Sequence, residues 1–97
     1  SSVWFRQIAE GDETAFTKVF YHYNRYIYPY VLKKVQSDGT AKEIIQDAFM
    51  KLWIYRDALK ETSSPEGYLF RIVSNLIQDH FSKKAREVKM LQKVKKD

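Results

Sequence analysis

The amino-acid sequence predicts an all-α fold, a compact bundle of about four helices. Apolar residues recur at spacings of three and four in four segments, which is the period of an amphipathic helix. Glycine, serine, aspartate or proline, which favour helix ends, separate these segments. A hydrophobic content of 44% and an aromatic content of 15% exclude a disordered chain. The length of 97 residues corresponds to one domain, residues 1–97.

The first two predicted helices lie on either side of Gly11. The first is short, about Val3 to Ala9, and glycine favours its end because it adopts left-handed dihedral angles without strain. Asp12 is placed to cap the second helix by accepting a bond from a free backbone N–H. Pro29 removes a backbone donor, so we expect a kink or break near Ile27. The apolar stripe of this helix consists of Phe16, Phe20, Tyr23, Ile27, Tyr30 and Val31.

The third helix follows a turn signal at Asp38-Gly39. Thr40 and Glu43 match a capping box, in which each side chain bonds to the backbone N–H of the other residue. We expect this helix to run to about Tyr55. Its apolar face consists of Ile44, Ile45, Ala48, Phe49, Leu52 and Trp53.

The fourth helix follows residues 57–64 (DALKETSS), which break the apolar pattern and indicate a loop. Ser64 and Pro65 match an N-cap followed by proline at the first helical position. Beyond Phe81 the helix becomes polar and rich in lysine. Its expected buried residues are Leu69, Ile72, Val73, Leu76, Ile77 and His80.

The formal net charge of +5 is unevenly distributed. Residues 1–62 carry a net charge of +1, whereas residues 63–97 carry eight Lys/Arg and four Asp/Glu, a net of +4. This bias favours a polyanionic partner for the last helix. The absence of cysteine suits a reducing compartment, and no apolar run approaches the roughly 18 residues of a membrane span. We therefore expect a cytoplasmic protein without membrane insertion.

Nothing in the sequence indicates an enzyme. The two histidines, His22 and His80, do not form a metal-type spacing, and we expect His80 to line the core. There is no glycine-rich phosphate loop and no nucleophile motif. We therefore expect no catalytic residue, no metal and no cofactor.

The polar edge of the third helix has two interpretations. Glu43, Asp47 and Lys51 are spaced by four and share a face. The acidic residues lie near the helix start, where the dipole favours negative charge, so a solvated edge accounts for them. The alternative is an acidic patch that docks a basic partner helix, and exposure of Met50 or Ile54 beside it would favour that alternative.

The fourth helix carries the residue types that contact nucleic acid. Asn and Gln bind an adenine edge through two hydrogen bonds, and Arg binds guanine or phosphate. An ordinary solvated face remains the alternative, although Asn75 is a mediocre helix former and invites another reason for its position. Tyr68 fits either core packing or stacking on an unpaired base, whereas Trp53 fits core packing. The polar stripe consists of Arg71, Asn75, Gln78, Asp79, Ser82 and Arg86, with Lys83, Lys84 and Lys89 near its end.

The run from Phe16 to Arg86 resembles region two of bacterial sigma factors, most closely the extracytoplasmic-function (ECF) group. The matching segments, in the family's order, are GDETAFTKVFYHY, AKEIIQDAFMKLWIYRD and SPEGYLFRIVSNLIQDHFSKKAR. The resemblance implies a helical domain that binds the clamp coiled coil of the largest RNA polymerase subunit. It also implies recognition and melting of the promoter minus-ten element through unstacked bases of the non-template strand, and an anti-sigma factor as a further partner.

The resemblance assigns expected roles to particular positions. Asn75 matches an asparagine that helps to hold the flipped base, the loop from Leu59 to Ser64 matches the base pocket, and Arg71 matches an arginine that contacts phosphate. The implied polymerase-binding residues are Glu43, Gln46, Asp47, Met50 and Lys51. The implied DNA-binding residues are Leu59, Lys60, Ser63, Ser64, Tyr68, Arg71, Asn75, Gln78, Asp79, Ser82, Lys83 and Arg86.

The chain departs from the family pattern in three places. The usual proline corresponds to Asn24 and not to Pro29, and Leu59 stands where some relatives have an aromatic residue. The helix-turn-helix domain (region four) that reads the minus-35 element is absent from these 97 residues. Two other classes of protein remain as alternatives. One is a helical protein-interaction module with a non-specific basic tail, and the other is a helix-turn-helix protein, for which residues 57–64 are too long a turn.

Overall fold

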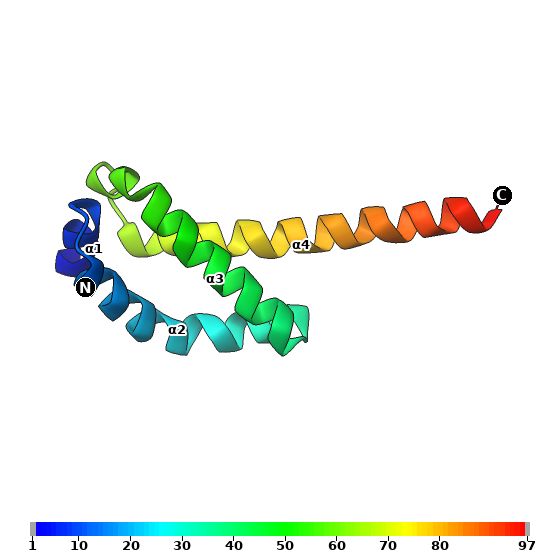
Figure 1. The fold of residues 1–97 in the computed structure, drawn as a ribbon, viewed down its shortest axis with the longest axis horizontal. Helices are drawn as coiled ribbons and strands as arrows, with labels where there is room; N and C mark the ends of the chain where they lie inside the picture. The colour runs from blue at the N-terminus through cyan, green and yellow to red at the C-terminus, as the bar shows by residue number, and fades with distance from the viewer. Residues whose placement is uncertain (1, 97) are drawn as a thin grey trace.

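The computed structural model describes residues 2–96, and every regular element in that part of the chain is helical (Figure 1). The elements are α1 (Ser2–Ala9), α2 (Glu13–Val35), α3 (Asp38–Ile54), the 3₁₀-helix η1 (Arg56–Lys60) and α4 (Pro65–Lys96). The prediction of an all-α fold with four α-helices is therefore confirmed. The short η1 helix was not predicted from the sequence.

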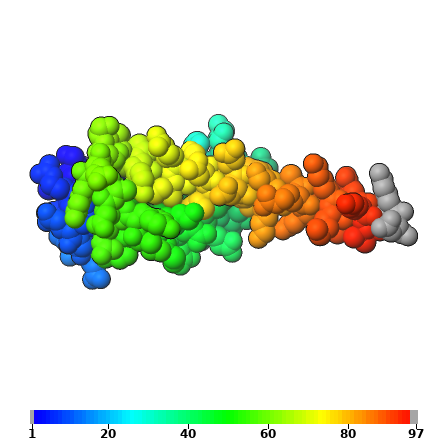
Figure 2. Space-filling model, turned by 90° about the horizontal axis from the view of Figure 1, so that it is seen from above, coloured from blue at the N-terminus to red at the C-terminus, as the bar shows by residue number. Residues whose placement is uncertain are grey.

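The bundle is built around α3, which packs against α2 on one side and against α4 on the other (Figure 1). The short α1 packs against α2 and η1. The second half of α4 projects beyond the bundle, and its side chains from Phe81 to Lys95 are all exposed (Figure 2). A helix of 32 residues is about 48 Å long, which explains a longest dimension of 57 Å against 24 and 20 Å for the others. Only the part before this projection is compact.

One apolar cluster holds the bundle together, and all four α-helices and η1 contribute to it. Phe5 and Ile8 fix α1 to the bundle because their side chains are fully buried. Burying a side chain of this size stabilises the fold by about 1.5–3 kcal/mol. The largest fully buried side chains are Phe5, Ile8, Val19, Ile27, Val31, Leu52, Leu69 and Val73.

The second helix differs from the prediction in two respects. It runs without a break through Pro29. A proline deprives the carbonyl four residues earlier, here that of Arg25, of its N–H donor, and both residues lie on the exposed side of the helix. Tyr30 is 42% exposed, and its neighbour Val31 is buried instead. The buried stripe follows a strict spacing of four, namely Ala15, Val19, Tyr23, Ile27 and Val31. The predicted cap is confirmed, since the Asp12 carboxylate accepts a hydrogen bond from the Ala15 N–H at 3.1 Å.

The junction between α2 and α3 shows that the predicted capping box is wrong. Gln36 ends α2 in a left-handed conformation (φ +56°), and its N–H donates to the Leu32 carbonyl. The Ser37 hydroxyl then caps α3 by accepting from the Thr40 N–H at 3.3 Å. The helix therefore begins three residues earlier than the capping box predicted, and Ser37 rather than Thr40 is its N-cap.

The predicted loop is half helical. Residues 56–60 form η1, which places Leu59 in the core with only 6% of its surface exposed. The start of α4 matches the prediction, because the Ser64 hydroxyl accepts from the Gly67 N–H at 3.1 Å. His80 is half-buried and does not belong to the core cluster, which corrects the prediction that it lines the core. The apolar face of α4 ends near Ile77, since α4 leaves the bundle soon after it.

A partly buried hydrogen bond joins the middle of α2 to the first turn of α4. The Tyr23 hydroxyl donates to the Glu66 carboxylate at 2.5 Å, and the Tyr23 side chain is 5% exposed. Burial raises the pKa of Tyr23, and the hydrogen bond and negative charge of Glu66 raise it further. The bond fixes where α4 starts relative to α2, and thus the direction in which the projecting part of α4 points.

We expect the folding stability to fall as the pH rises above about 10, the pKa of tyrosine in an unfolded chain. The folded-state pKa of Tyr23 is raised, so at alkaline pH the unfolded chain loses this proton first and unfolding is favoured. Thermal melts followed by circular dichroism should show a steeper alkaline loss for the wild type than for Tyr23→Phe. Tyr21→Phe, which removes an exposed hydroxyl from the same helix, should behave like the wild type. Parallel losses for Tyr23→Phe and the wild type would contradict this role.

Candidate protein-docking and nucleic-acid surfaces

The polar edge of α3 lies on the surface of the bundle. Its residues are Glu43, Gln46, Asp47, Met50 and Lys51, hereafter the docking edge, and all of them are exposed. Met50 is 53% exposed, and Ile54, one turn further, is 59% exposed. Within residues 2–96 no ion pair occupies Glu43 or Asp47. Exposed apolar residues beside unpaired carboxylates favour the interpretation as a protein-docking surface.

An apolar groove of about 650 Å³ lies between α2 and α3, next to the docking edge. Its walls include the aromatic side chains of Phe16, Phe20, Phe49 and Trp53, and these rings pack edge-to-face with centroids 4.9–6.2 Å apart. Gln46 and Met50 belong both to the groove and to the docking edge, so the two features form one surface.

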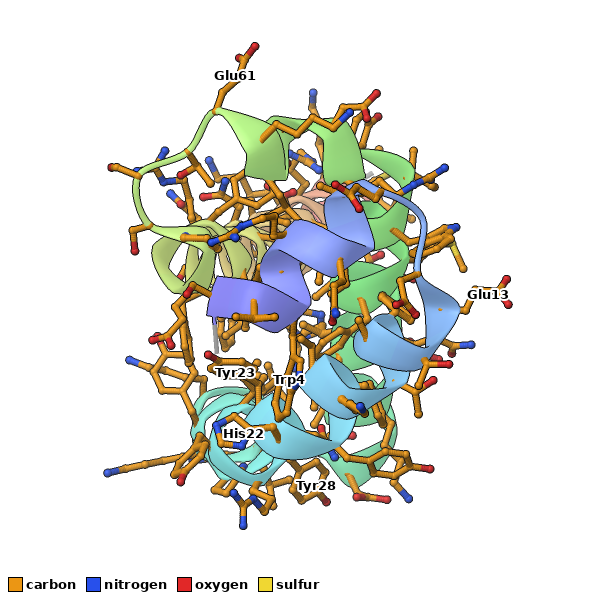
Figure 3. The ribbon with its side chains drawn as sticks, turned by 90° about the vertical axis from the view of Figure 1, so that its left-hand side faces the viewer. Trp4, Glu13, His22, Tyr23, Tyr28 and Glu61 are labelled. Atoms are coloured by element: carbon orange, nitrogen blue, oxygen red, sulfur yellow. The ribbon has the colours of Figure 1, made fainter. Side chains whose placement is uncertain are left out.

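Polar groups lie at both ends of this groove. At one end the Tyr28 hydroxyl donates to Asp38, which also pairs with Lys42 at 3.1 Å (Figure 3 labels Tyr28). The hydrogen bond from Tyr28 and the ammonium of Lys42 hold the pKa of Asp38 below its usual value. Near Trp53 the guanidinium of Arg56 lies 4.5 Å from the ring centroid. The groove was missed from sequence because its aromatic residues fit a core stripe equally well.

Successive residues of an α-helix are rotated by about 100° around its axis, and this rotation separates the polar residues of α4 into a main stripe and residues on either side of it. Tyr68, Asn75, Asp79, Ser82 and Arg86 lie within about 60° of one another and form the recognition stripe. Arg71 and Gln78 lie further round the helix, and Lys83 lies beside the stripe on its other side. All of these side chains are exposed except Tyr68, which is half-buried and packs against the core. Tyr68 therefore combines core packing with an accessible edge.

A second cavity, the loop cavity, has a volume of about 450 Å³ and lies where the segment before α4 meets α1. Leu59, Lys60 and Ser63 line it, so the structure brings together three of the four candidate residues of the predicted loop. The Ser64 hydroxyl is instead used to cap α4. The lining residues are Ser2, Arg6, Ala9, Glu10, Leu59, Lys60, Thr62, Ser63 and Pro65. The contribution of α1 was not predicted, because some 50 residues separate it from the loop in the chain.

The described part of the chain offers no other obvious chemistry. No helix among residues 2–96 is long and apolar enough to cross a membrane. The same residues contain no group of three or more His, Cys, Asp or Glu side chains placed to hold a metal ion. The candidate surfaces are thus the docking edge with its groove, the recognition stripe and the loop cavity.

An acidic edge on α3 and, on α4, an amide-bearing polar stripe with exposed lysines beside it define a helical domain suited to joining a protein partner to a nucleic acid. Comparison with known proteins agrees: the sequence model of the Sigma-70 region 2 family matches residues 19–87. The chain therefore belongs to the Sigma-70 region 2 family, and the predicted resemblance is confirmed.

The chain is also similar to the ECF RNA polymerase sigma factor SigW of Bacillus subtilis (strain 168). The two are 28% identical over 79 residues, which cover 81% of this chain and 42% of that protein. The chain thus spans less than half the length of this curated relative. No solved structure matches this chain.

Proposed function

We propose that this chain acts in transcription initiation as region two of an ECF sigma factor. In this proposal the docking edge and the α2–α3 groove bind the clamp coiled coil of the largest RNA polymerase subunit. The recognition stripe and the loop cavity bind the non-template strand of the promoter minus-ten element and help to melt it. The observation that carries the proposal is the presence of two exposed surfaces of different character in a Sigma-70 region 2 domain, an acidic edge on α3 and an amide-bearing stripe with neighbouring lysines on α4.

The energetics of melting require both surfaces. Flipping a base out of a duplex costs a few kcal/mol of unstacking and unpairing. Stacking of a base on an aromatic ring contributes about 1–3 kcal/mol, and a good pair of hydrogen bonds to a base contributes a similar amount. One or two such contacts on α4 nearly offset the cost, and tethering to the polymerase raises the local concentration of DNA enough to supply the rest.

The projecting part of α4 adds a contribution that is independent of sequence. Lys83, Lys84, Arg86 and Lys89 are exposed there and attract phosphate. Four phosphate contacts on a single strand give a slope of roughly −3 in log affinity against log salt concentration. A preference for particular bases should persist at salt concentrations that remove this attraction.

The test is a selection from a pool of single-stranded oligonucleotides with a randomised segment, made with this chain bound to the polymerase core. We expect enrichment of a short sequence at about 0.2 M salt, and capture of the chain by the isolated clamp coiled coil. No enrichment and no capture would refute the proposal. That outcome would fit a helical protein-interaction module, which the exposed apolar residues Val88, Leu91 and Val94 favour. An anti-sigma factor as a further partner stays a prediction.

A further inference from the structure

The loop cavity has a wall that the loop alone does not provide. Arg6 of α1 and Glu10, which directly follows α1, face the same cavity as Lys60 and Ser63. Figure 3 shows α1 lying across the bundle beside the segment that leads into α4. The cavity volume of about 450 Å³ falls within the range of about 300–1,000 Å³ that is typical of small-ligand sites.

The backbone of Glu10 is held in place by hydrogen bonds, although the residue is exposed. Its N–H donates to the Gln7 carbonyl at 3.1 Å, and the N–H of Gly11 donates to the Ile8 carbonyl at 2.8 Å. Gly11 completes this turn with a φ of +91°, a conformation that glycine adopts without strain. Since Ile8 is fully buried, the turn that carries Glu10 is anchored to the core.

The charged groups of the cavity are available to a ligand. Arg6 and Glu10 are four residues apart, yet within residues 2–96 no ion pair joins them. Arg6 and Lys60 supply positive charge that suits a phosphate, whereas the Glu10 carboxylate only accepts hydrogen bonds. The floor is apolar, with Ala9 and Leu59 buried beneath. An apolar floor, cationic rim and one acceptor match an unstacked nucleotide whose base carries an amino group.

We propose that α1 forms part of the base-binding site, and that Glu10 selects against thymine at one position of the bound strand. A carboxylate accepts a hydrogen bond from the amino group of cytosine, and adenine and guanine also carry amino groups. Thymine has no amino group: beside its major-groove acceptor O4 it offers only the N3–H of its imide, and the O2 and O4 acceptors on either side of that N–H repel a carboxylate, so thymine is the poorest match of the four bases. This inference rests on the proposed function, because only a domain that binds unpaired DNA meets an unstacked base.

The position that Glu10 reads differs from the one that Asn75 reads. Pro65 lines the loop cavity at the start of α4, and Asn75 lies ten residues further along the same helix. At 1.5 Å per residue this separation is about 15 Å along the helix axis. We therefore expect Glu10 and Asn75 to contact different bases, and each should affect a different position of the strand.

The experiment repeats the oligonucleotide selection on the polymerase core with Glu10→Gln. Glutamine keeps the acceptor but adds a donor for thymine O4. We expect the wild type to deplete thymine about five- to tenfold at one position. This depletion corresponds to the lower end of the discrimination that contacts to a single base provide. Glu10→Gln should lose this depletion there and keep the preferences at other positions. Glu61→Gln, whose side chain points away from the molecule in Figure 3, removes the same charge close by and should select like the wild type.

The outcomes separate this inference from the proposed function. If the wild type enriches a sequence but depletes thymine nowhere, or if Glu10→Gln selects the same pool as the wild type, the inference fails and the proposed function stands. If the wild type enriches no sequence, the inference fails, and the proposed function fails with it when the isolated clamp coiled coil also captures no chain. A melt by circular dichroism should give the same midpoint for Glu10→Gln and the wild type, because the Glu10 side chain is exposed.

Discussion

Asp47→Arg should weaken binding of this chain to the polymerase clamp coiled coil by about a hundredfold. The substitution replaces an attraction to a basic partner by a repulsion, and like charges facing one another across an interface cost several kcal/mol. Asp47 is exposed and has no ion pair within residues 2–96, so folding should change by less than about 0.5 kcal/mol. Titration of a labelled coiled-coil fragment, followed by anisotropy, measures the change in affinity.

Lys51→Glu provides a matched control because Lys51 lies on the same edge of α3, one turn beyond Asp47. If the partner is basic at this point, this variant should bind as tightly as the wild type or more tightly. The affinity difference should also shrink as salt is added, since exposed charges are screened beyond about 10 Å at 0.1 M salt. Equal weakening by both variants would show that the edge contributes shape and not charge, and would contradict the proposed basic partner.

Much of the fold follows from the sequence, because helix periodicity and local caps are encoded by neighbouring residues. Asp12 and Ser64 cap α2 and α4 as predicted, since each is followed three residues later by a free N–H in the first turn. Ser37 was overlooked because Asp38-Gly39 is typical of a turn. In the structure this pair forms the first turn of α3, where Asp38 is held by Tyr28 and Lys42.

It was harder to predict which of two adjacent residues is buried when both lie at the edge of the apolar face of a helix. Tyr30 and Val31 differ by one position, and the aromatic pattern YHYNRYIYPY places tyrosines on two opposite sides of the helix. Tyrosine tolerates exposure because its hydroxyl remains solvated, so only packing decides which side is buried. Leu59 was placed in a loop because a five-residue 3₁₀-helix is too short to show a period.

The candidate binding surfaces depend more strongly than the helices do on contacts between segments that are distant in the sequence. The residues of the docking edge and the recognition stripe were found from the sequence because each set lies on one helix. The loop cavity was found only in part, because Arg6 and Glu10 reach it through the packing of α1 against η1. No local pattern in a short N-terminal helix indicates such a contact.

Asn75→Ala should reduce base selectivity of the bound strand by about five- to hundredfold at one position while polymerase docking stays unchanged. The amide of Asn75 offers a donor and an acceptor to a base edge, and a good pair of such bonds contributes about 1–3 kcal/mol. The side chain is exposed on the recognition stripe, so its removal creates no cavity. Anisotropy with the selected oligonucleotide and with single-base variants of it measures the loss.

Stability separates a binding role of Asn75 from a structural one. Alanine is a better helix former than asparagine by roughly 0.5 kcal/mol, so Asn75→Ala should melt at a slightly higher temperature than the wild type. Ser74→Ala changes an exposed neighbour on another side of α4 and should leave base selectivity intact. A variant that is more stable yet selects bases less well requires that Asn75 contacts the DNA. Unchanged selectivity in Asn75→Ala would mean that the stripe is an ordinary solvated helix face and would leave the loop cavity as the sole base-binding site.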